Sequence, residues 1–168
     1  MVCVMCGHEM SCQVGVYHYK ECGLDDVYLV NVRICTCDNC DEEVVCVPAM
    51  PQLHTLIGEE LLKKDSRLNG KEIRFLRKNM GLKAVELQEY LGVDNATISR
   101  WERGSQKITP PHDRLLRMVY ATVKRIPQDK IASMLKDVFR QIQRDAVAST
   151  LHIDIDLTRI VNTCLLPA

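Results

Sequence analysis

The sequence has no run of apolar residues long enough to cross a membrane as a helix, which takes about 18 or more. Its first residues lack the basic stretch and apolar core of a secretory signal peptide. We therefore expect a cytoplasmic protein with no membrane partner. A disulfide framework is not expected in that reducing compartment, so clustered cysteines favour metal ligation.

Motifs of catalysis are also missing from the sequence. It shows no Ser-His-Asp triad pattern, no Gly-rich phosphate loop and no paired-carboxylate motif. A nucleophilic cysteine would in addition need a base placed beside it. We therefore expect a protein that is not an enzyme.

The formal net charge of zero hides three unlike regions. Residues 1–60 hold 2 Lys/Arg against 10 Asp/Glu, residues 61–126 hold 15 against 7, and residues 127–168 hold 5 of each. A basic region of this kind is what phosphate contacts need. We expect a zinc-binding domain over 1–60, a helix-turn-helix domain over 61–126 and a C-terminal extension over 127–168.

Eight of the nine cysteines lie in the first 46 residues. Cys3 and Cys6 form one Cys-x-x-Cys pair, and Cys37 and Cys40 form a second pair after thirty further residues. Two such turns supply four thiolates to one tetrahedral ion with no open position, which favours structural Zn²⁺ over catalytic Zn²⁺. β-branched and aromatic residues over 14–19, 27–34 and 43–47 predict three strands. The pattern is that of a zinc ribbon.

The other cysteines have simpler interpretations. Cys35 lies two residues before Cys37 and is an alternative ligand, although Cys-x-Cys is the poorer geometry for a zinc turn. The rest are interpreted as small buried apolar residues: Cys12, Cys22, Cys46 and Cys164.

From Asn69 the pattern becomes helical. Asn69 and Glu72 form a capping-box arrangement, and the first helix is expected to end at Gly81. A second helix is predicted over 83–91 and a third over 95–103, with a turn at 92–94 between them. In such a unit the second helix of the pair enters the DNA major groove.

The third helix divides into two faces. Ile98 and Trp101 are three residues apart and are expected to face the core. The opposite stripe is free to meet DNA and comprises Asn95, Ala96, Ser99, Arg100 and Arg103, with Thr97 at its flank. Arg100 and Asn95 are the expected base-reading residues, and Lys83, Arg103 and Lys107 the expected phosphate contacts. The alternative for each charged residue is a solvated helix face.

The C-terminal region predicts a helix from Pro127 to about residue 148 and a strand over 151–158, where apolar and polar residues alternate. A lone strand is not stable. We favour pairing with the same strand of a second copy, because a two-fold dimer reads a palindromic operator. The alternative is a tail folded onto its own chain.

Residues 92–104 and 69–78 resemble the helix-turn-helix of Xre/Cro-type repressors. Together with the two Cys-x-x-Cys pairs, residues 1–126 resemble the MqsA-type antitoxins with their YgiT-type zinc finger. The resemblance implies a homodimeric repressor with a structural zinc, whose zinc module binds a small basic ribonuclease toxin and whose remainder represses the operon. Two positions depart from the pattern: Lys83 stands where a Gln often starts the second helix, and Asp41 where a Gly often follows the second cysteine pair.

The sequence thus predicts an α+β protein, with a small β zinc ribbon, a mainly helical DNA-binding domain and a C-terminal helix and strand. The expected function is a sequence-specific transcriptional repressor of a palindromic operator, acting as an antitoxin that autoregulates its operon. The alternative is a zinc-ribbon adaptor for protein–protein contacts without sequence-specific DNA binding.

Overall fold

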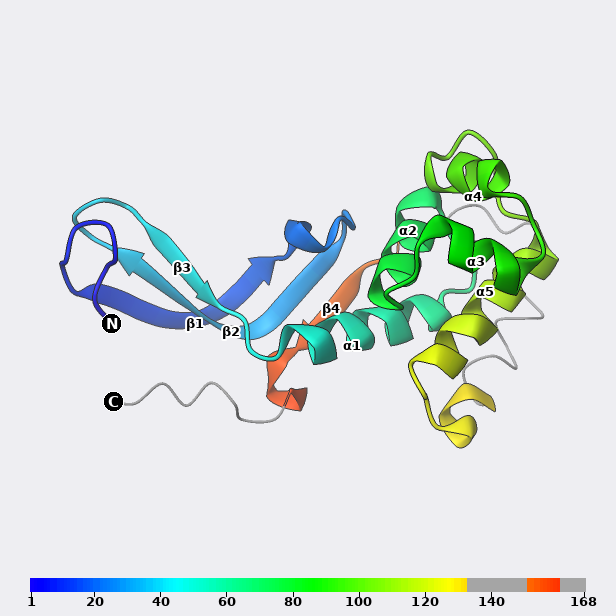
Figure 1. Ribbon diagram of the computed structural model, residues 1–168. Helices are drawn as coiled ribbons and strands as arrows, with labels where there is room; N and C mark the ends of the chain where they lie inside the picture. Colours follow the sequence, from blue (N-terminus) through cyan, green and yellow to red (C-terminus); the bar gives the residue numbers. More distant parts are fainter. Residues whose placement is uncertain (133–150, 161–168) are drawn as a thin grey trace.

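The computed structural model describes residues 1–132 and 151–160. It confirms the α+β class: a twisted sheet forms one end of the molecule and a group of helices the other (Figure 1). None of the helices in these two ranges is long and apolar enough to cross a bilayer. Most of the helix expected from Pro127 to residue 148 lies outside the described residues, although residues 128–132 are helical.

The sheet is built around one long central strand, β2 (Val27–Cys37). β1 (Met10–His18) runs antiparallel along one edge of β2. On the other edge, β3 (Glu43–Cys46) pairs with residues 33–36 and β4 (Ile153–Asp156) pairs with residues 27–30. The two short strands therefore follow one another along the same edge of β2.

A bulge divides β2 between these two pairings. Gly15 faces Val32 but its neighbour Val16 faces Val30, so Asn31 is the extra residue. Asn31 adopts a left-handed φ of 58°, which Asn tolerates better than most residues. Its side-chain amide donates to Asp156 at the end of β4 (3.0 Å). The bulge thus also fixes where β4 ends.

β4 corrects our expectation for the C-terminal strand. It pairs in parallel with β2 of its own chain and not with a second copy. The predicted alternation of buried apolar and polar side chains is confirmed, because Ile153, Ile155 and Leu157 are buried. The apolar side chains complete the core beside Val27 and Leu29, which explains why the strand returns to this sheet.

α1 (Met50–Lys63) connects the sheet to the helical part and crosses the boundary expected at residue 60. Leu53, Ile57 and Leu61 recur every fourth residue, and all three are buried. Sheet, α1 and the following helices share one continuous apolar core. The helix was not anticipated, although this spacing and Pro51 in its first turn were available signals.

Three helices occupy the predicted helix-turn-helix region: α2 (Gly70–Asn79), α3 (Ala84–Leu91) and α4 (Asn95–Glu102). The capping box of Asn69 and Glu72 is present, as predicted. A fourth helix, α5 (Pro110–Val123), packs behind them and was not anticipated.

A buried polar network holds α1, the loop after it and α5 together. Arg117 of α5 is fully buried, pairs with Asp113 (2.7 Å) and donates to the carbonyls of Leu61, Leu62, Lys64 and Ser66. Asp113 in turn accepts the backbone N–H of Leu68 (2.7 Å). Arg117 thus hydrogen-bonds carbonyls at the end of α1 that have no partner within the helix. The bond from Leu68 to Asp113 fixes the chain just before α2 begins.

Candidate metal centre and nucleic-acid interface

The two Cys-x-x-Cys turns have the same backbone geometry. In the first, the N–H of Gly7 donates to the carbonyl of Cys3 (2.9 Å), and the N–H of Cys3 donates to the carbonyl of His8 (2.8 Å). In the second, Asp41 donates to Cys37 and Cys37 to Glu42, both at 2.9 Å. Gly7 and Asp41 occupy equivalent places, with φ of 75° and 57°.

These turns bring the four predicted ligands together. The sulfur atoms of Cys3, Cys6, Cys37 and Cys40 all lie within 4.8 Å of one another. A tetrahedral zinc with Zn–S bonds of about 2.3 Å sets its sulfurs roughly 3.8 Å apart. The Cys3–Cys40 and Cys6–Cys37 sulfur distances, 3.6 Å and 3.4 Å, are close to that value. The four cysteines can therefore bind a metal ion.

The thiols influence one another strongly. A backbone hydrogen bond at His8 lowers the pKa of Cys6 to about 5. At Cys40 the backbone hydrogen bond of Glu42 acts in the same direction, but the neighbouring sulfurs and burial outweigh it and raise the pKa to about 12. Four adjacent sulfurs do not all ionise easily without a cation between them, which is the situation that a divalent ion relieves.

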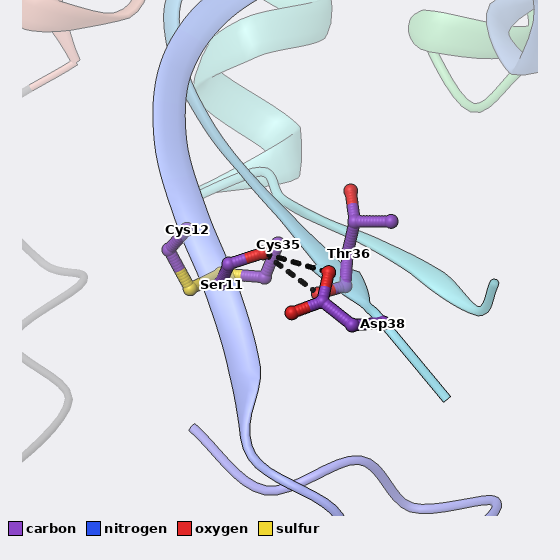
Figure 2. Close-up of a disulfide and its surroundings, with 5 residues drawn as sticks. All are labelled: Ser11, Cys12, Cys35, Thr36 and Asp38. Carbon is purple, nitrogen blue, oxygen red and sulfur yellow. Dashed lines mark hydrogen bonds between the residues drawn. A yellow bond between two sulfur atoms is a disulfide. The ribbon is translucent and has the colours of Figure 1, made fainter. Parts of the chain in front are cut away.

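The remaining cysteines differ from our expectation. Cys12 is exposed and forms a disulfide with the buried Cys35, its direct partner across β1 and β2 (Figure 2). Cys35 is therefore not a metal ligand here. Cys22 and Cys46 are half-buried rather than buried, and Cys164 lies outside the described residues. Sequence spacing did not show the disulfide, because it depends on the register of two strands.

α4 is placed by its two core residues. Ile98 and Trp101 are buried, as their spacing predicted. Asp94 caps the helix by accepting the N–H of Thr97, and this bond lowers the pKa of Asp94. The left-handed Gly92 ends α3 and sets the turn between the two helices. The opposite face of α4 is thereby turned outward.

All of the predicted DNA-contacting residues are at least partly accessible. Six are exposed: Lys83, Asn95, Ala96, Arg100, Arg103 and Lys107. Thr97 and Ser99 are half-buried. One guanidinium nitrogen of Arg100 lies 3.5 Å from both Thr97 Oγ1 and Gln106 Oε1, and Arg103 donates to the carbonyl of Ser99 (3.2 Å). The end of each guanidinium stays at the surface.

An ion pair missed in the sequence holds α4 on α2. Arg77 of α2 forms a two-bond pair with Glu102 of α4 (2.5 and 3.0 Å), and both side chains are largely buried. Arg77 also donates to the carbonyl of Leu82 before α3 (2.9 Å). One guanidinium therefore ties together all three helices. No local pattern links residues 25 positions apart, so the sequence carried no signal for this pair.

A family model described as a helix-turn-helix (HTH_3) matches residues 73–116. Comparison with curated proteins and with solved structures yields no significant match. The matched region runs from α2 into α5 and includes α3 and α4. The match supports a DNA-binding transcription regulator.

Proposed function

We propose that this protein is a sequence-specific transcriptional repressor that reads DNA with α4. The observation that carries the proposal is the exposure of Asn95 and Arg100 on α4, whose core-facing side chains Ile98 and Trp101 are buried. Arg can form two hydrogen bonds with guanine and Asn can do so with adenine. Lys83, Arg103 and Lys107 are also exposed and suit phosphate contacts.

The test begins by selecting preferred sequences from fragmented genomic DNA and then measures affinity for the selected sequence. We expect Arg100→Ala to weaken that affinity roughly 5- to 150-fold, the equivalent of about 1–3 kcal/mol for a bidentate base contact. Arg33→Ala is the control, because it removes the same charge from an exposed position on β2 in the sheet.

Two results would count against this function. If Arg100→Ala binds the selected sequence as tightly as the parent chain, α4 is not the reading helix. If selection at physiological salt returns no preferred sequence, the chain is better described as a protein-interaction adaptor.

We further propose that the four cysteines hold a structural Zn²⁺. All four positions are protein sulfurs, so no ligand site is left for water or substrate. The far end of the sheet has only a small buried cluster, which consists of Cys3, Met10, Cys35 and Cys37. The metal would supply stability that so small a core does not provide.

The finer proposal is an antitoxin that acts as a homodimer on a palindromic operator and autoregulates its operon. It is supported by the sequence resemblance and by the acidic balance of residues 1–60, which suits a small basic partner. We expect the adjacent reading frame to arrest growth when expressed by itself and to be harmless when this chain is coexpressed. If this chain gives no relief from such arrest, the protein is a repressor only.

A further inference from the structure

The Cys12–Cys35 disulfide lies beside the metal centre on the same face of the sheet. Because side chains alternate along a strand, Cys35 and Cys37 of β2 point to the same face of the sheet. Both belong to the small buried cluster with Cys3 and Met10. Cys35 is two residues from the ligand Cys37. Cys12 is two residues beyond Met10, which faces Cys37 across the strands.

A second contact joins the same strands at this point. Ser11, next to Cys12, donates to the carbonyl of Thr36 (3.3 Å) and lies 3.5 Å from a carboxylate oxygen of Asp38, inside the second metal-binding turn (Figure 2). The disulfide therefore joins β1 to β2 at the place where β2 leads into that turn.

The two residues of the bond differ in access. Cys12 is exposed, whereas only 2% of Cys35 is accessible. This difference favours attack by an incoming thiolate at Cys12 over attack at Cys35. Exposure of this kind is typical of disulfides that exchange.

We propose that Cys12 is a site of thiol–disulfide exchange, and that the Cys12–Cys35 bond controls how tightly the neighbouring four-cysteine centre holds its metal. The thiolate of a dithiol reductant attacks Cys12 Sγ, forms a mixed disulfide and expels the Cys35 thiolate, which takes up a proton. The second thiol of the reductant then displaces Cys12, which leaves two protein thiols and an oxidised reductant. Oxidised glutathione reverses the reaction and leaves two glutathione thiols.

Chain connectivity explains the effect on the metal. Cys6 and Cys37 are 31 residues apart, and bringing both turns to one ion must close that loop. With the disulfide in place, the path between them runs from Cys6 to Cys12, across the bond, and from Cys35 to Cys37, or about nine links. The free energy of loop closure grows as (3/2)RT ln n, so the equilibrium constant for closure falls as the three-halves power of loop length. The oxidised chain should therefore bind zinc about sixfold more tightly.

The inference rests on the proposed occupancy of the centre by zinc, and the experiment separates the two. The zinc-loaded full chain is incubated with oxidised glutathione or with a phosphine reductant, and its zinc affinity is measured by competition with a chromophoric chelator. Peptide mapping without reduction identifies the cysteines that are joined. We expect the oxidised chain to hold zinc about sixfold more tightly than the reduced one.

Cys12→Ser and Cys12→Ala should both match the reduced chain under either condition. Cys22→Ser, which removes a half-buried cysteine outside the pair, should keep the full response. Equal zinc affinity in the oxidised and reduced parent chain overturns the control of the metal centre by this bond. A response that persists in both Cys12 variants overturns Cys12 as the exchange site. Either result leaves the metal assignment intact. A chain that binds no zinc in either state overturns both.

Discussion

At the scale of single residues, the two Cys-x-x-Cys turns have the same backbone conformation but reach it with different residues. Gly7 and Asp41 each take a left-handed φ and each donate to the carbonyl of the first cysteine of the turn. Glycine adopts that conformation without a penalty, and Asp is among the few other residues that tolerate it. The departure at Asp41 therefore leaves the second turn intact.

We expect Gly7→Ala to destabilise the protein by about 1–2 kcal/mol, because a Cβ atom is unfavourable at this φ. No heavy atom lies within 4 Å of the position where that Cβ would sit, so the loss is conformational and not steric. The measurement is the melting temperature at a fixed zinc concentration, where about 1 kcal/mol corresponds to roughly 2–4 °C. Asp41→Gly is the matched control and should not lower the melting temperature; equal melting temperatures for Gly7→Ala and the parent chain would contradict the argument.

At the scale of elements, the position of α4 depends on contacts with α2. The Arg77–Glu102 pair joins the two helices at one point, and close backbone packing at Gly70 joins them at another. A Cβ on Gly70 would lie 2.6 Å from the carbonyl oxygens of both Trp101 and Glu102. Only glycine lets the first turn of α2 approach the end of α4 this closely.

Gly70→Ala should therefore destabilise the protein by about 1–3 kcal/mol, the usual cost of overpacking. Helix propensity by itself predicts the opposite, since Ala is favoured over Gly by about 1 kcal/mol inside a helix. DNA affinity should fall as well, because α4 must shift. Urea unfolding and DNA titration measure the two effects, and Gly15→Ala is the control, since its Cβ would make an ordinary 3.4 Å contact with Ile34. A more stable Gly70→Ala chain would disprove the close packing.

At the scale of the whole molecule, the two sites lie at opposite ends. The metal-binding turns form the far end of the sheet, and α4 lies among the helices at the other end (Figure 1). β2 and α1 connect them through one continuous core. The regions also carry opposite charge, −8 over residues 1–60 and +8 over residues 61–126.

The C-terminal strand is part of that core, so its removal should destabilise the entire fold. A chain ending at residue 150 loses four buried apolar side chains, Ile153, Ile155, Leu157 and Ile160. Each contributes about 1.5–3 kcal/mol by burial, and their sum rivals a typical total stability of about 5–15 kcal/mol. We expect loss of the cooperative unfolding transition in circular dichroism. A cooperative transition in the shorter chain would show that β4 is dispensable.

Residue spacing along the chain determined the local features of this protein. The two Cys-x-x-Cys pairs each specified a tight turn, the Asn69–Glu72 capping box specified the start of α2, and the Ile98–Trp101 spacing specified the inward face of α4. Each of these signals acts within one turn of backbone, where geometry follows directly from residue order.

Only the tertiary structure decided which distant segments meet. It returned β4 to β2 of the same chain, opposed Cys12 to Cys35 through strand register, and paired Arg77 with Glu102. Alternation showed that β4 has a buried face, but not which strand completes it. Such pairings depend on how several elements together exclude water, a property that no single stretch of sequence contains.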